Sequence, residues 1–80
     1  MPAEIVAERD EAVAFRDINP QAPLHVLVVP RQHYPDAAAL ARADAELLTA
    51  VFQLAADVAH SEGIVEEGYR MVTNTGDAAG

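Results

Sequence analysis

The stretch of sequence that decides the fold runs from Phe15 to His33 and reads F-R-D-I-N-P-Q-A-P-L-H-V-L-V-V-P-R-Q-H. Its Asn-Pro-Gln-Ala-Pro turn excludes regular structure, because each proline lacks a backbone N–H and disfavours helix at the residue before it. Leu24 to Val29 is apolar except at His25, and Pro30 ends the run. A strand that is polar on neither face is typical of a central strand covered on both sides, so we predict that position for it.

The segments around this stretch predict a mixture of helix and strand. Glu4 to Glu8 and Ala12 to Phe15 are short β-prone segments joined by a polar turn, so we expect them to pair as a hairpin. Ala37 to Arg42 predicts a short turn of helix that Asp36 can cap. Tyr69 to Thr73 alternates in polarity and predicts a further strand. With the long helix described next, the expected order is β, β, β, α, β, an α+β fold.

A single long helix is predicted from Asp44 to about Glu62, with Asp44 as its N-cap and Gly63 just past its end. Two neighbouring apolar stripes recur at helical spacing. They are Leu47, Val51, Leu54 and Val58 in the first stripe and Leu48, Phe52, Ala55 and Ala59 in the second. Together they are broader than one sheet contact needs. The pattern therefore fits either a helix well buried in its own domain or one shared with a symmetry mate.

Length and charge exclude several classes of function. The chain has 80 residues, which is one small domain at most, and a domain of this size is only marginally stable alone. The formal net charge of -8 disfavours binding to long nucleic acids or anionic membranes. There is no cysteine, so disulfides and thiolate metal sites are excluded. We see neither a signal peptide nor a membrane-spanning run, and expect a soluble, cytoplasmic protein.

Asp17 is a candidate ligand-binding residue because it follows Phe15 at a strand end. A carboxylate there can accept two hydrogen bonds from a vicinal diol, as in ribose recognition. Phe15, Ile18 and Leu27 could wall a pocket for a flat base. The alternative is that Asp17 caps the Asn19-Pro20 turn through local hydrogen bonds. The spacing alone leaves both interpretations open and favours the cap.

The three histidines are ambiguous by themselves. His25 lies inside an apolar strand, where a lone histidine is usually neutral and hydrogen-bonded, and His33 follows that strand. His60 is near the end of the long helix, where the helix dipole favours a cation. Their spacing does not match a zinc site, and no cofactor fingerprint is present, so we expect neither a metal nor a cofactor. The loop from Asn74 to Gly80 could approach an anion through its backbone.

Taken together, these residues resemble the core of histidine triad (HIT) proteins of the HINT, or purine nucleoside phosphoramidase, branch. The family pattern is Phe, any residue, Asp-Ile, a Pro-rich turn, His, an apolar strand ending in Pro, then a basic residue and His. P-A-E-I-V-A-E resembles the hairpin strand before this pattern, and G-Y-R-M-V-T-N-T-G-D-A-A-G resembles the strand and loop before the triad. The resemblance covers nearly the whole chain. It implies a single partial HIT-like domain over residues 1–80, with an antiparallel sheet and one long helix packed on it, truncated at both ends.

The resemblance also implies roles for individual residues. Phe15, Ile18 and Leu27 would contact the base and sugar of a purine nucleoside monophosphate or its phosphoramidate, and Asp17 would bind the ribose hydroxyls. His25 would support the active-site histidine cluster, and His33 would lie near it. Asn74 would face the phosphate side, with Gly80 close to it. The family further implies a homodimer paired through its long helices and sheets.

The sequence departs from the family at its defining motif, His-φ-His-φ-His-φ-φ, where φ is an apolar residue. The second histidine of that motif is the nucleophile, and the motif is expected a few residues after Gly80, where the 80 residues end. Two hypotheses follow. The chain is either the nucleotide-binding part of a HIT-type phosphoramidase or nucleotidyl hydrolase, or a truncated, non-catalytic dimerisation or nucleotide-binding module. Whether the chain is itself an enzyme stays open, because a nucleophilic mechanism needs the attacking imidazole.

Overall fold

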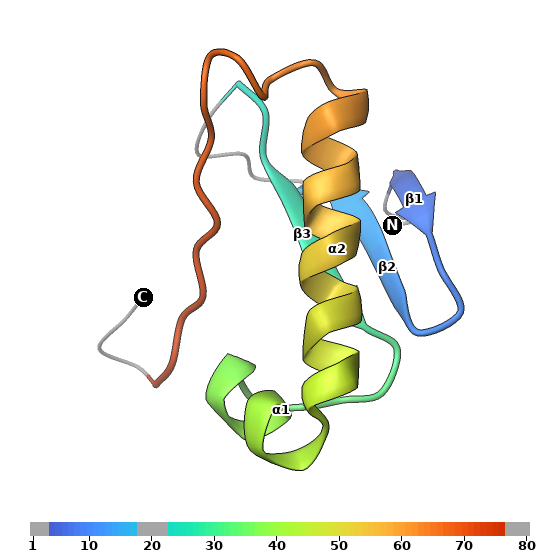
Figure 1. Ribbon diagram of the computed structural model, residues 1–80, viewed down its shortest axis with the longest axis vertical. Coiled ribbons are helices and arrows are strands. Elements are labelled where there is room, and N and C mark those ends of the chain that lie inside the picture. Colours follow the sequence, from blue (N-terminus) through green and yellow to red (C-terminus); the bar gives the residue numbers. More distant parts are fainter. Residues whose placement is uncertain (1–3, 18–22, 77–80) are drawn as a thin grey trace.

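The structure is a computed structural model that describes residues 4–17 and 23–76 (Figure 1). Three strands form one antiparallel sheet in the order β1-β2-β3. Their bounds are Ile5–Glu8 for β1, Ala12–Arg16 for β2 and Val26–Pro30 for β3. Two helices follow, α1 over Ala37–Ala43 and α2 over Ala45–Ser61. The predicted α+β fold is therefore confirmed, with the long helix lying along one face of the sheet.

The predicted hairpin is confirmed by the pairing of β1 with β2. Arg9 donates its backbone N–H to the carbonyl of Ala12 at 2.8 Å, which closes the turn between the two strands. The register places Ile5 opposite Phe15 and Ala7 opposite Ala14, with an irregularity between Ile5 and Ala7. β2 pairs without interruption with β3 along its other edge. β2 is thus the central strand of the described sheet.

Both helices begin at the capping residues that the sequence indicates. The Asp36 carboxylate accepts a hydrogen bond from the Ala39 N–H at 2.7 Å, and Asp44 accepts one from the Leu47 N–H at 3.0 Å. Each bond satisfies one of the backbone donors that the first turn of a helix leaves unpaired. At the other end of α2, Gly63 has a φ of 74°, the left-handed conformation that commonly ends a helix.

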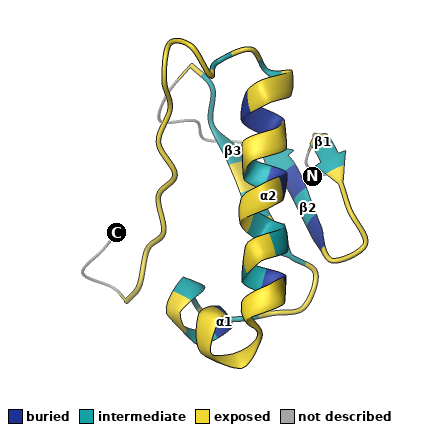
Figure 2. Ribbon diagram, viewed as in Figure 1, coloured by how far each residue is buried: buried dark blue, intermediate teal, exposed yellow. Residues whose placement is uncertain are grey.

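The hydrophobic core lies between α2 and the face of the sheet that it covers (Figure 2). Ala12 and Ala14 of β2 are buried against Leu54 and Val58 of α2. The alanines have small side chains, so the helix can approach the strand closely, and Leu54 is only 1% exposed. Burying such a leucine contributes about 2 kcal/mol. The second apolar stripe is covered only in part, since Phe52 remains 42% exposed.

The prediction that β3 is a central strand covered on both faces is wrong for the described sheet. β3 is an outer strand, and it begins at Val26 rather than at Leu24. Its burial alternates, because successive side chains point to opposite faces and α2 covers only one of them. Leu27 and Val29 on the other face are each 38% exposed.

The predicted strand from Tyr69 to Thr73 is also not observed. These residues run as an exposed, extended segment beyond α2, and no strand is assigned to them (Figures 1 and 2). Alternating polarity favours a strand, but a strand also needs a neighbouring chain to receive its hydrogen bonds. Among residues 4–17 and 23–76, no neighbour pairs with this segment. Over the same residues, neither helix is long and apolar enough to cross a bilayer.

Candidate functional site

Asp17 and His25 meet where β2 ends and β3 is about to begin. The Asp17 N–H donates a hydrogen bond to the His25 carbonyl at 3.0 Å, which extends the β2–β3 ladder by one residue pair. The side chains also meet, with Asp17 Oδ2 3.4 Å from His25 Nδ1. Both are partly buried, at 20% exposure for Asp17 and 30% for His25. A carboxylate beside Nδ1 orients the ring so that Nε2 lies on its far side.

An apolar surface lies next to this pair on the same face of the sheet. Phe15 and Leu27 are directly opposite each other across β2 and β3, and Ile5 is opposite Phe15 across β1 and β2. Side chains alternate along a strand, so Phe15 shares its face with Asp17, and Leu27 shares its face with His25. That face is the one turned away from α2, because Ala12 and Ala14 occupy the other.

This arrangement can bind a small molecule that is flat and apolar at one end and carries hydroxyls at the other. The apolar side chains can stack against or enclose a ring, and the carboxylate can accept hydrogen bonds from a diol. We refer to Ile5, Phe15, Asp17, His25 and Leu27 as the sheet-face site. Among the described residues, no group of three or more His, Cys, Asp and Glu side chains is arranged to hold a metal ion.

The remaining predicted residues lie elsewhere or outside the described ranges. His33 is exposed in the loop after β3, and His60 is exposed in the last turn of α2. Asn74 is exposed as well, and it lines a groove of about 290 Å³ together with β3 and α2. Ile18 and Gly80 are outside the described residues, as is the Asn19-Pro20 turn that the alternative interpretation of Asp17 invokes.

Comparison with a family model identifies the chain. The model of the HIT domain matches residues 1–80, which is the whole sequence. The chain belongs to the HIT family. The resemblance stated from the sequence is therefore confirmed, and the sheet-face site lies on a HIT domain.

Relatives and solved structures agree with this membership. Purine nucleoside phosphoramidase of Escherichia coli K12 is 40% identical over 75 residues, which are 94% of this chain and 63% of that protein. An uncharacterised HIT-like protein of Rickettsia prowazekii is 37% identical over all of this chain and 68% of its own length. A HIT family hydrolase from Clostridium thermocellum superposes with a TM-score of 0.92 at 40% identity, covering 100% of this chain and 70% of that one. This HIT domain thus spans less than two thirds of its E. coli relative.

Two residues of functional interest were missed by sequence reasoning. The sequence pattern predicts Ile5 only as part of the hairpin, although an apolar side chain on the more exposed face of a strand can mark a binding surface. For Arg16, the sequence pattern predicts no functional role. Its guanidinium contacts two carboxylates, and hydrogen bonds to Glu62 and then to Glu4 raise the pKa of Arg16 above its usual value. The contacts of Arg16 with Glu4 and Glu62 join residues that are 12 and 46 positions apart, so no local sequence pattern predicts them.

Proposed function

We propose that this HIT domain binds a purine nucleoside monophosphate, or its phosphoramidate, on the face of the sheet opposite α2. It would do so as the nucleotide-binding part of a nucleoside phosphoramidase or nucleotidyl hydrolase in the cytoplasm. The observation that carries the proposal is the position of Asp17, beside His25 on one side and the apolar pair Phe15 and Leu27 on the other. The name of the E. coli relative supports the choice of substrate class.

Each part of the sheet-face site suits one part of a nucleotide. The Asp17 carboxylate accepts hydrogen bonds from the two ribose hydroxyls, which distinguishes a ribonucleotide from a simple phosphate ester. Phe15 and Leu27 contact the purine base and sugar, and the family resemblance alone assigns the same role to Ile18. His25, oriented by Asp17, would support the phosphate side, to which the family resemblance alone also assigns Asn74 and Gly80. A net charge of -8 makes local recognition of this kind necessary, because the domain as a whole repels anions.

The proposed chemistry is transfer of a nucleotidyl group to a histidine. An imidazole nitrogen bonds to phosphorus while the P–N bond to the amine breaks, and the amine leaves with a proton. Water then cleaves the nitrogen–phosphorus bond and releases the nucleoside monophosphate. In HIT proteins, the attacking residue is the second histidine of His-φ-His-φ-His, and the 80 residues of this sequence contain no such motif. A second candidate for these 80 residues is a module that binds the nucleotide without turning it over.

A homodimer formed through α2 is part of the proposal. Leu48, Phe52 and Ala56 form an apolar surface on α2 together with Thr49 and Gln53. Phe52 is 42% exposed there, which is costly for a large aromatic side chain in a small domain. Burying this surface against a second copy would remove its apolar area from water, which favours association.

The binding proposal is tested by isothermal titration of the 80-residue chain with AMP. The Asp17→Ala variant is expected to bind at least about tenfold more weakly, because hydrogen bonds to a charged group are lost. Asp10→Ala is the matched control, since it removes the same charge from an exposed turn and should bind within about twofold of wild type. Equal affinity of Asp17→Ala and Asp10→Ala would refute the assignment of Asp17.

A turnover assay tests whether these 80 residues contain a working nucleophile. Adenosine 5′-phosphoramidate is incubated with the chain, and release of AMP is followed by ³¹P NMR. Binding without AMP release is expected of both candidates, since neither places the attacking histidine within these 80 residues. AMP release that Asp17→Ala abolishes supports an enzyme and refutes the view that these 80 residues lack a working nucleophile.

A further inference from the structure

Arg16 and Asp17 are neighbours in sequence that serve opposite faces of the sheet. Arg16 is the last residue of β2, paired with Val26, and Asp17 follows it opposite His25. Side chains alternate along an extended chain, so Arg16 points to the α2 side and Asp17 to the site side. Fixing the Arg16 side chain therefore also restricts the direction in which Asp17 can point.

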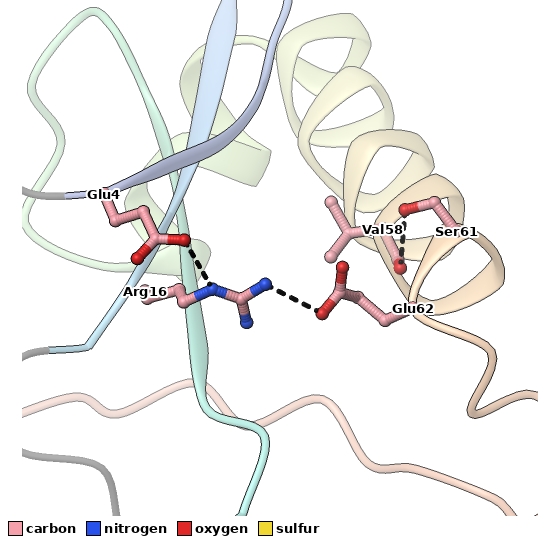
Figure 3. A network of polar contacts seen from close by, with 5 residues as sticks. All are labelled: Glu4, Arg16, Val58, Ser61 and Glu62. Carbon is pink, nitrogen blue, oxygen red and sulfur yellow. Dashed lines mark hydrogen bonds and ion pairs between the residues drawn. The ribbon is translucent and has the colours of Figure 1, made fainter.

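The Arg16 side chain is held from two directions (Figure 3). Its Nε donates to Glu4 Oε2 at 3.1 Å, and its Nη2 donates to Glu62 Oε1, also at 3.1 Å. Glu4 precedes β1, and its carbonyl also accepts the Arg16 backbone N–H at 2.9 Å. Glu62 is the C-cap residue of α2. One guanidinium thus ties the end of β2 to the residue before β1 and to the C-terminus of α2.

Geometry and charge make this network firmer than an ordinary surface ion pair. The planar guanidinium presents donors in fixed directions, so two acceptors define its orientation. Glu62 is only 23% exposed, compared with 72% for Glu4. The C-terminus of a helix also favours a nearby cation, and Arg16 lies there. The raised pKa of Arg16 agrees with this, since both carboxylates stabilise its charged form.

We propose that Arg16 is a positioning residue for Asp17, which it holds in the orientation that meets His25 and the ribose of the substrate. The inference rests on the proposed function and adds to it a residue on the opposite face of the sheet. The end of β2 needs such an anchor because the ladder there reaches its last pair, and strand ends separate readily. The contacts of Arg16 with Glu4 and Glu62 provide this anchor at the residue next to Asp17.

A matched control is available at the other end of the sheet. Arg9, in the turn after β1, donates to Asp57 Oδ2 of α2 at 3.3 Å. This pair also ties the sheet to α2, but it lies at the end of β2 opposite to Asp17. Arg9→Met and Arg16→Met both remove a guanidinium and keep an unbranched apolar side chain. A purely stabilising role predicts similar effects of the two substitutions on the site.

The test compares wild type, Arg16→Met, Arg16→Lys and Arg9→Met in AMP affinity and in hydrogen exchange of the Asp17 amide. Arg16→Met is expected to weaken AMP binding about tenfold and to speed exchange at Asp17, because small misplacement of a contact group costs much of its effect. Arg16→Lys should give an AMP affinity and an Asp17 exchange rate between those of wild type and Arg16→Met. The lysine ammonium keeps the charge but cannot hold two acceptors in fixed directions. Arg9→Met should change neither quantity by more than about twofold.

Two outcomes would overturn the inference. One is an Asp17 amide that exchanges at the same rate in Arg16→Met as in wild type. The other is an equal loss of AMP affinity in Arg16→Met and Arg9→Met. If wild type binds no AMP, the proposed function fails by itself, and exchange at Asp17 alone then decides whether Arg16 positions it.

Discussion

The carboxylate of Asp17 faces the imidazole of His25, with Oδ2 3.4 Å from Nδ1, at the point where the β2–β3 ladder ends. The backbone of Asp17 donates to the carbonyl of the same histidine at 3.0 Å. Two separate contacts therefore hold this residue pair together. Two residues along each strand from Asp17 and His25, the ladder also places Phe15 opposite Leu27. An acidic group, an imidazole and an apolar surface are thus adjacent on one face.

If the Asp17 carboxylate accepts hydrogen bonds from the ribose, its contribution to AMP affinity must depend on the ribose hydroxyls. Wild type is expected to bind AMP about tenfold or more tightly than 2′,3′-dideoxy-AMP, because two hydrogen bonds to a carboxylate are missing from the second ligand. Asp17→Ala should bind the two ligands equally. The measurement is competition titration of both nucleotides with each protein. A preference for AMP that persists in Asp17→Ala contradicts the ribose contact.

Self-association should depend on the apolar surface of α2 around Phe52. Phe52→Glu is expected to weaken the homodimer by at least about a hundredfold, because it places an unpaired charge in an apolar contact. Ala41→Glu adds the same charge to an exposed position of α1 and should leave the dimer intact. Analytical ultracentrifugation over a range of protein concentrations measures both. A monomeric wild type, or identical association of the two variants, argues against a dimer through α2.

The core between α2 and the sheet should be sensitive to loss of Leu54, which is 1% exposed. Leu54→Ala is expected to lower the free energy of unfolding by about 3 kcal/mol, from lost burial and the remaining cavity. Val65→Ala, at a side chain that is 51% exposed, should cost below about 0.5 kcal/mol. Urea unfolding followed by circular dichroism measures both losses, and comparable losses would contradict the described core.

The N-cap of α2 gives a test that does not depend on the core. Asp44→Ala should destabilise the domain by about 1 kcal/mol, because the Leu47 N–H loses its acceptor. Asp44→Asn keeps an oxygen at the same place and should cost much less. The two urea midpoints distinguish a capping role from a general effect of charge, which would affect both variants alike.

The contribution of Arg16 to stability should not change between neutral and moderately alkaline pH. Its pKa is raised in the folded state by Glu62 and Glu4, so the folded protein holds this proton more tightly than the unfolded chain. The stabilisation is then fully present below the usual pKa of arginine and is lost only as pH rises past it. The difference in urea midpoint between wild type and Arg16→Met is expected to be the same at about pH 7 and about pH 9.5. If the difference in urea midpoint shrinks between these two pH values, the stabilisation does not come from the charged Arg16 side chain.

Local signals in the sequence predicted most of the fold. The hairpin, the caps at Asp36 and Asp44 and the end of α2 at Gly63 all depend on residues within a few positions of each other. The family resemblance assigns Phe15, Asp17, His25 and Leu27 to one site. These residues lie opposite one another in a single strand pair, so the register that local structure imposes is enough to assemble them.

The tertiary structure decided which faces and edges are covered. Tyr69 to Thr73 has the pattern of a strand but no strand partner among residues 4–17 and 23–76, and β3 is an outer strand whose Leu27 and Val29 are only partly covered. Arg16 reaches Glu62 across 46 positions of sequence, a contact that no local pattern specifies. The sequence by itself determined the hairpin, the strand that ends at Pro30, the two helices and their caps, because short-range hydrogen bonds and side-chain periodicity set them. Only the packing of α2 on the sheet decided which face of the sheet the helix covers and which distant side chains, such as Arg16 and Glu62, come into contact.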